Sequence, residues 1–140
     1  MCSSDLPFRL LSFEGKQPEE LLQALQKEEL SGLSFKILRT KDSSGKTVEG
    51  VYVVIRDWSS WKPTELAFAM MRLSVRWQTP SPFSGVKDSE RNLFNKHVGS
   101  SAWWNRIEGS AGEIDPRPFL AKWDLQAQSF RKQVSHCLLY

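Results

Sequence analysis

The sequence has few of the residues that build metal sites, disulfide frameworks and membrane spans. Two of its 140 residues are cysteine and two are histidine, and none of them lies at the paired spacing that zinc sites use. Its longest strongly apolar run, around VYVVI, is too short for a membrane span or for the apolar part of a signal peptide. We therefore expect no metal, no cofactor and no membrane contact, and a cytoplasmic location follows by elimination.

Templates for nucleophilic and phosphate-binding sites are missing as well. The stretch GSSAW does not form the G-x-S-x-G turn of a serine nucleophile. The glycine-rich residues 109–115, GSAGEID, lack the lysine and the following Ser or Thr of a phosphate-binding loop. Asp57, Glu113 and Asp115 lie in predicted loops, where carboxylates are usually solvated or cap helices. We therefore predict that the protein is not an enzyme.

Apolar periodicity and the positions of prolines predict the elements of the first half of the chain. A strand is expected over residues 7–13, followed by a helix that begins at Pro18 and stops near residue 31. Residues 33–56 predict a β-hairpin, because two strand-like stretches flank the turn DSSGK. A second helix is expected over residues 63–77, where apolar residues repeat at three- and four-residue spacing after a proline.

The same patterns predict which side chains face the core. In the hairpin, the expected core residues are Val51, Val53 and Ile55. In the helix that follows, the expected core stripe comprises Leu66, Met70, Leu73 and Trp77. The opposite stripe, which we expect to face solvent or a ligand, comprises Glu65, Ala69, Arg72 and Arg76.

The second half is predicted as a loop-rich insertion over residues 78–115 and a long terminal helix over residues 116–138. Within the insertion, KDSERNLFNKHV indicates a short helix, and AWWNRI, residues 102–107, indicates either a fourth strand or a helical turn. Asp115 and Pro116 suit the cap and the first turn of the terminal helix. Its apolar stripe, expected to be core, comprises Phe119, Trp123, Ala127, Phe130, Val134 and Cys137 or Leu138.

These elements indicate a single α+β domain over residues 1–140. The length suffices to bury roughly two thirds of the unfolded surface in one core. The order is β-α-β-β-α, then the insertion and the terminal helix, and an antiparallel sheet with helices packed on one face accounts for it. If residues 102–107 pair as a strand, the order becomes βαββαβ, the ferredoxin-like arrangement.

The most unusual feature of the composition is its six tryptophans. Four of them, Trp58, Trp61, Trp103 and Trp104, lie in or beside predicted loops, and tryptophan is enriched at binding hot spots. Because neighbouring side chains diverge, we expect at least one ring of the adjacent pair to be exposed or to cover a loop. We predict a non-catalytic regulatory or accessory protein that docks on a macromolecular partner, foremost a protein or a second copy, through these loops with Arg106 at the rim.

Two alternatives remain. The first is RNA or DNA binding, although the net charge of only +3 and the stretch EGVYVVI, which lacks the aromatic signature of an RNA-binding sheet, weaken it. Its candidate residues on the sheet and helix faces are Lys36, Arg39, Tyr52, Arg56, Arg72 and Arg76. The second alternative is a small enzyme with a site in the loops of residues 78–115, which would join His97 to Asp57 or Glu113.

Overall fold

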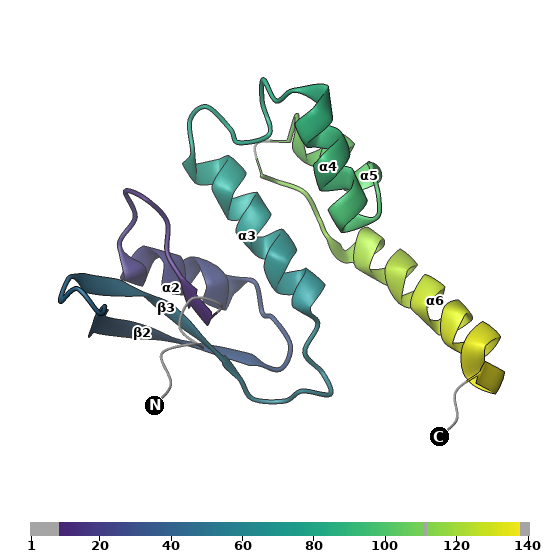
Figure 1. The fold of residues 1–140 in the computed structure, drawn as a ribbon, viewed down its shortest axis with the longest axis horizontal. Coiled ribbons are helices and arrows are strands. Elements are labelled where there is room, and N and C mark those ends of the chain that lie inside the picture. The colour runs from purple at the N-terminus through teal and green to yellow at the C-terminus, as the bar shows by residue number, and fades with distance from the viewer. Residues whose placement is uncertain (1–8, 111, 138–140) are drawn as a thin grey trace. The chain divides into compact units, whose positions relative to one another are not determined.

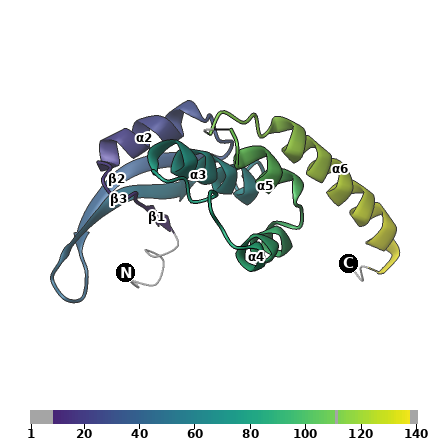
Figure 2. The same ribbon diagram turned by 90° about the horizontal axis from the view of Figure 1, so that it is seen from above.

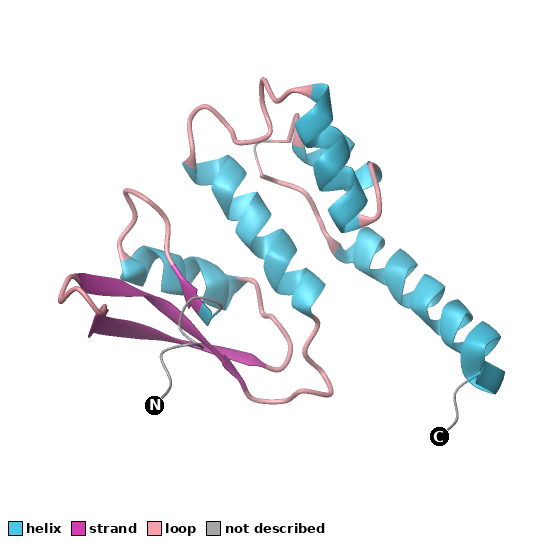
Figure 3. Cartoon of the chain, in the orientation of Figure 1, coloured by secondary structure: helices cyan, strands magenta, loops and turns pink. Residues whose placement is uncertain are grey.

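The computed structural model describes residues 9–110 and 112–137 of the chain. Strands occupy the first part of the chain and helices most of the rest (Figure 3). In chain order the elements are β1 (Leu10–Leu11), α2 (Pro18–Lys27), β2 (Leu33–Lys41), β3 (Thr47–Ile55), α3 (Pro63–Trp77), α4 (Asp88–Val98), α5 (Ala102–Ile107), α6 (Arg117–Val134) and a short 3-10 helix, Ser135–Cys137 (Figure 1). The predicted α+β class is confirmed.

The chain divides into two compact units, which we call unit 1 (Met1–Ala69) and unit 2 (Met70–Tyr140). The buried apolar residues of unit 1 are Leu21, Leu25, Val51, Val53, Phe68 and Ala69. Those of unit 2 are Leu73, Val75, Phe83, Trp103, Trp104 and Ile107. Each unit is described separately below, and the organisation of residues 1–140 as one domain stays a prediction.

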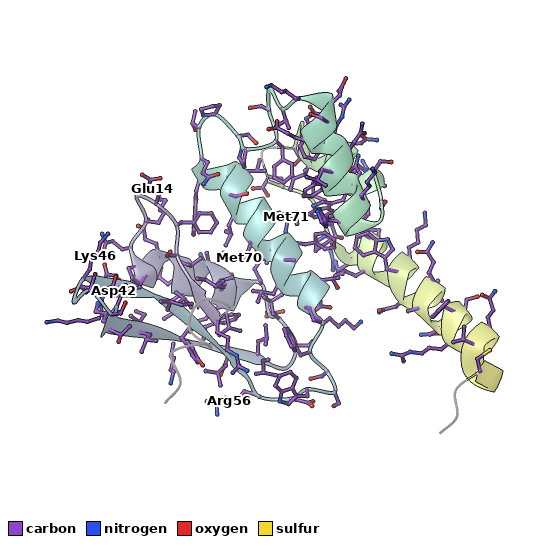
Figure 4. The ribbon with its side chains drawn as sticks, in the orientation of Figure 1. Glu14, Asp42, Lys46, Arg56, Met70 and Met71 are labelled. Atoms are coloured by element: carbon purple, nitrogen blue, oxygen red, sulfur yellow. The ribbon has the colours of Figure 1, made fainter. Side chains whose placement is uncertain are left out.

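The predicted hairpin forms most of an antiparallel sheet with the strand order β1-β3-β2. β2 and β3 pair from Leu33 opposite Ile55 to Lys41 opposite Thr47. The turn between them is closed by the carboxylate of Asp42, which accepts a hydrogen bond from the backbone N–H of Lys46 at 3.0 Å, and both residues lie at the tip of the hairpin (Figure 4). The β-branched centre of β3 suits a pleated, half-buried surface.

Helix α2 covers one face of this sheet (Figure 2). Pro18 occupies the first turn, where its missing N–H costs nothing, and the carboxylate of Glu20 accepts a hydrogen bond from the backbone N–H of Gln17 at 3.1 Å. Leu21 and Leu25 are fully buried. Because β3 lies between β1 and β2, β1-α2-β2 is a split β-α-β unit.

Two strand predictions need correction. The strand expected over residues 7–13 is limited to Leu10–Leu11 in the described part of the chain, and residues 7 and 8 lie outside it. Residues 102–107 form helix α5 and not a fourth strand, so they do not complete the ferredoxin-like arrangement. Their two adjacent large rings are accommodated by packing on different sides of a helix.

The helical core predictions are only partly right. Leu73 of α3 is buried as expected, but Ala69, assigned to the solvent stripe, is fully buried. Helix α6 has no buried residue among those described, and Phe130 near its end is 62% exposed. The predicted core stripe of this helix is therefore wrong: Phe119 near its start packs against Trp103, whereas the later turns stay open to solvent.

Within the described residues, the last α-helix ends before the predicted boundary. The helix predicted over 116–138 is observed as Arg117–Val134 with the 3-10 turn Ser135–Cys137 after it, and Leu138 lies outside the described residues. Cys137, expected in the core stripe, is exposed. Within the described ranges, no helix has the length and apolar character needed to cross a membrane.

Candidate functional site

The adjacent indoles of α5 are both buried, at 0% exposure for Trp103 and 3% for Trp104. Trp103 donates its Nε1–H to the sulfur of Met71 at 3.1 Å, a residue of α3 (Figure 4). The ring of Trp103 also meets the ring of Phe119 edge to face, with centroids 5.3 Å apart. We expected at least one of the two indoles to be exposed or to cover a loop, and the first of these alternatives is wrong, since neither ring is exposed.

Trp104 leaves α5 toward a different set of rings. Its centroid lies 5.0 Å from that of Phe83 and 5.1 Å from that of Phe94, and these two phenylalanines also meet each other edge to face. Such edge-to-face aromatic pairs stabilise a core beyond the area they bury. The two indoles diverge as expected, but each enters packed surroundings, so neither is available for the partner binding predicted for it.

The other tryptophan pair follows β3 in unit 1 and differs in exposure. Trp58 is 67% exposed, and its ring meets that of the half-buried Trp61 edge to face at 5.5 Å. Ahead of it, Asp57 accepts hydrogen bonds from the backbone N–H and the hydroxyl of Ser59, at 2.9 and 2.7 Å. These bonds to serine, with those from Ser60, lower the pKa of Asp57 to about 2.

Unit 2 contains a cavity of about 560 Å³, within the size range of small-molecule sites. Three consecutive segments line it: α5 with the residues before it, the loop to α6, and the first turns of α6. The lining residues are Ser100, Ala102, Arg106, Ser110, Glu113, Ile114, Asp115, Pro118, Phe119, Lys122 and Trp123. We call this space the unit 2 cavity.

Two arginines of α3 hold the loop that walls the cavity. Arg72 donates an Nη1–H to the carbonyl oxygen of Ile114 at 3.1 Å, and Arg76 forms an ion pair with Glu113 at 3.2 Å. Gly112 has φ +83°, and a Cβ there would lie 2.7 Å from the carbonyl oxygen of Arg72. Only glycine allows this backbone approach without strain, so the loop is fixed closely against α3.

The charged groups of the cavity are unequally paired. Glu113 is paired with Arg76, and Asp115 is paired with Arg117 at 2.8 Å. Arg106 and Lys122 are exposed and form no ion pair with any residue that the structure describes. The cations of the cavity are therefore free to meet a ligand, while its carboxylates are already neutralised by neighbours.

The ionisation of the carboxyl groups limits the chemistry that they support. The hydrogen bonds from Arg117 lower the pKa of Asp115. Among the described residues, every carboxyl group with a clear pKa shift is shifted downward, namely Glu19, Glu20, Asp42, Asp57 and Asp115. A carboxylate held ionised in this way suits an electrostatic or basic role, whereas a proton donor needs a raised pKa.

The sheet residues named for nucleic-acid binding already have partners in unit 1. Arg39 forms ion pairs with Glu19 at 2.6 Å and with Glu49 at 3.0 Å. Lys36 lies over the ring of Tyr52, 5.4 Å from its centroid. Arg56, labelled in Figure 4, donates its Nε–H to the hydroxyl of Ser34 at 2.9 Å.

The helix residues named with them, Arg72 and Arg76, hold the cavity loop instead of facing a ligand. All six residues named for nucleic-acid binding therefore make contacts within their own unit.

The other residues that the sequence offered as site candidates lie only partly at the cavity. Glu113 and Arg106 line the unit 2 cavity, but His97 is exposed on α4 and is not among its lining residues. Within the described ranges, no group of three or more His, Cys, Asp or Glu residues is arranged to hold a metal ion. Sequence reasoning missed Lys122, and it placed Phe119 and Trp123 in a core because their helical spacing is the same for a core stripe and a cavity wall.

Comparison with known proteins identifies the family. A family model described as exo-β-N-acetylmuramidase NamZ, C-terminal, matches residues 3–140. No curated protein is significantly similar to the chain. Among solved structures, a DUF1343 family protein from Bacteroides fragilis NCTC 9343 is similar in fold, with a TM-score of 0.74 and 21% identity over 96% of this chain. The match covers 36% of that protein, so the chain spans about a third of its length.

These findings overturn the functional predictions made from the sequence. A family described by the name of a glycosidase contradicts a non-catalytic regulatory or accessory protein, and it contradicts the prediction that the protein is not an enzyme. The RNA-binding alternative is wrong for the same reason. The pattern reasoning tested only for short catalytic motifs, and their absence from the chain does not exclude membership of this family.

Proposed function

Because the chain belongs to the family of the NamZ C-terminal domain, we propose that it forms the C-terminal part of an exo-β-N-acetylmuramidase. Such an enzyme hydrolyses the β-glycosidic bond of a terminal N-acetylmuramic acid residue. The observation that carries this proposal is the extent of the family match, residues 3–140. The fold likeness to a protein about three times as long agrees with a domain that works as one part of a larger chain.

The unit 2 cavity supports a saccharide-binding role for this part. Its volume of about 560 Å³ is suitable for a sugar residue, and its wall combines two aromatic rings with hydrogen-bonding and charged side chains. Glycoside hydrolysis generally uses two carboxyl groups, one of which acts as a proton donor while the other is ionised. Asp115, whose pKa is lowered, fits the ionised kind and not the donor.

The test is a domain exchange. An active exo-β-N-acetylmuramidase of the family has its C-terminal region replaced by residues 3–140 of this chain, and release of a chromophore from a β-N-acetylmuramide is measured. The parent enzyme without its C-terminal region is the matched control, and the corresponding β-N-acetylglucosaminide tests specificity. We expect the exchange to restore most of the activity that truncation removes.

The proposal fails if the exchanged protein is folded, as judged by circular dichroism and a cooperative unfolding transition, but releases no chromophore above the truncated control. Equal activity of the truncated and intact parents would also overturn it, because the region would then contribute nothing to hydrolysis. Two further expectations stay predictions, namely the cytoplasmic location and a protein partner or second copy. Cell fractionation and sedimentation velocity test them.

A further inference from the structure

We propose that the unit 2 cavity binds a sugar that carries a carboxylate, with Arg106 and Lys122 on the carboxylate and Trp123 against the sugar ring. This inference rests on the proposed function, because N-acetylmuramic acid differs from N-acetylglucosamine by a lactyl ether that ends in a carboxylate. It goes further by assigning the recognition of that group to particular residues. The cavity would thereby distinguish the two sugars.

The first argument is the charge left over in the cavity. Its two carboxylates are occupied by Arg76 and Arg117, whereas Arg106 and Lys122 have no ion pair among the described residues. A small space with two uncompensated cations favours an anion. Arginine in addition offers a planar fork of donors that matches a carboxylate.

The second argument is the aromatic wall. Phe119 packs edge to face against the buried Trp103, with centroids 5.3 Å apart, and Trp123 follows one turn later with its centroid 6.4 Å from that of Phe119. Phe119 and Trp123 both line the cavity. Phe119 is thus held by the buried Trp103 and in turn borders Trp123, so the two rings form one apolar surface that suits the C–H face of a pyranose.

The third argument is that the cavity is held open by contacts outside it. The loop of residues 112–114 is attached to α3 through Arg72 and Arg76, and α5 is anchored through the bond between Trp103 and Met71. These contacts leave Arg106 and Lys122 with no structural task among the described residues. A wall that is already positioned loses little entropy when a ligand binds.

The experiment is a calorimetric titration of the 140-residue chain with N-acetylmuramic acid and, separately, with N-acetylglucosamine. We expect N-acetylmuramic acid to bind at least tenfold more tightly, and Arg106→Gln and Lys122→Gln each to weaken its binding roughly tenfold, the size of one charged hydrogen bond. Neither change should alter binding of N-acetylglucosamine. Trp123→Ala should weaken both sugars, and Lys132→Gln, an exposed position on the same helix outside the cavity, is the matched control.

Each outcome decides the matter. Equal affinity for the two sugars, no binding of either, or unchanged binding of N-acetylmuramic acid by Arg106→Gln and Lys122→Gln overturns the inference. If the domain exchange restores hydrolysis but the two variants bind normally, the proposed function stands and this cavity is not the carboxylate subsite. If the sugars are distinguished as expected but the exchange gives no hydrolysis, the subsite stands and the proposed function fails.

Discussion

The hairpin of unit 1 is held by backbone hydrogen bonds between segments close in sequence, whereas the helices of unit 2 are held by side chains far apart in the chain. β2 and β3 pair in register across a short turn. In unit 2, the bond from Trp103 to Met71 spans 32 residues, and that from Arg72 to Ile114 spans 42. Local pairing gives unit 1 a regular surface, while the long-range contacts give unit 2 a cavity.

The two tryptophan pairs also differ between the units, in how far their rings are exposed. Trp58 and Trp61 follow the end of a strand, where one ring is 67% exposed. Trp103 and Trp104 lie on a short helix that is packed on two sides, and both rings are buried. An excess of tryptophan therefore has no single meaning in this molecule, because the number of elements that surround each ring decides whether it is surface or core.

The largest effect is expected from Trp103→Ala compared with Trp58→Ala. Removing the fully buried indole leaves a void and frees the start of α6, so the free energy of unfolding should fall by about 3–5 kcal/mol. Removing the exposed indole should change it by less than about 0.5 kcal/mol. Urea denaturation followed by far-ultraviolet circular dichroism measures both, and losses of similar size would remove the contrast between the units.

The next effect is expected from Gly112→Ala, with Gly45→Ala as the control. Both glycines have φ +83°, but a Cβ at Gly45 meets nothing within 4 Å while one at Gly112 would contact the carbonyl of Arg72. The control should therefore lose about 1 kcal/mol from backbone strain alone, and Gly112→Ala about 2–3 kcal/mol. The same urea titrations serve here, and equal losses would show that the loop is not held against α3.

A smaller effect is expected from Arg72→Gln, compared with Arg39→Gln. Arg72 makes a part-buried hydrogen bond to Ile114, and its loss should lower the free energy of unfolding by about 1–2 kcal/mol. Most of this loss should persist at high salt, because salt screens only the additional attraction between Arg72 and Asp115. Arg39 makes only exposed ion pairs, so its substitution should shift the urea midpoint slightly and only at low salt. A loss for Arg72→Gln that disappears at high salt would contradict the assignment.

The smallest effect is expected on the pH dependence of stability, which we compare for Asp57 in unit 1 and Asp115 in unit 2. Because the folded pKa of Asp57 is lowered from 3.8 to about 2, its contribution is present above 3.8 and is lost as the pH falls toward 2. Asp57→Asn should therefore lower the urea midpoint near neutral pH but not below pH 2. The pKa of Asp115 is lowered by the charged Arg117, so added salt should reduce the contribution of Asp115 to the pH dependence of stability. The contribution of Asp57, whose partners are uncharged serines, should not change with salt. Comparing Asp115→Asn and Asp57→Asn with the parent chain at low and high salt measures the two contributions.

The elements of unit 1 were predictable because they depend on neighbouring residues. Alternation of apolar residues and the DSSGK turn predicted the hairpin, and Pro18 predicted the start of α2, as observed. Val51 and Val53 are buried as expected. Each of these features follows from the strand or helix period and from turn chemistry, which act over a few residues.

Unit 2 was predictable only where the same local rules apply. The helices α3 and α4 were expected and are present. Periodicity assigned Phe130 to a core, but it is exposed because no described element covers the later turns of α6. The walls of the cavity are held by the hydrogen bonds from Arg72 to Ile114 and from Trp103 to Met71, whose partners lie more than thirty residues apart. Periodicity and turn chemistry act over a few residues, so they cannot predict such contacts.

The hydrogen bond between Trp103 and Met71 has a chemical consequence for the cavity. Its acceptor is a thioether sulfur, which oxidants convert to a sulfoxide that is larger and more polar. Beside a fully buried indole, the added oxygen has little room and disturbs the packing behind α5. Peroxide would therefore disturb the wall of the unit 2 cavity from its rear side, through the half-buried Met71.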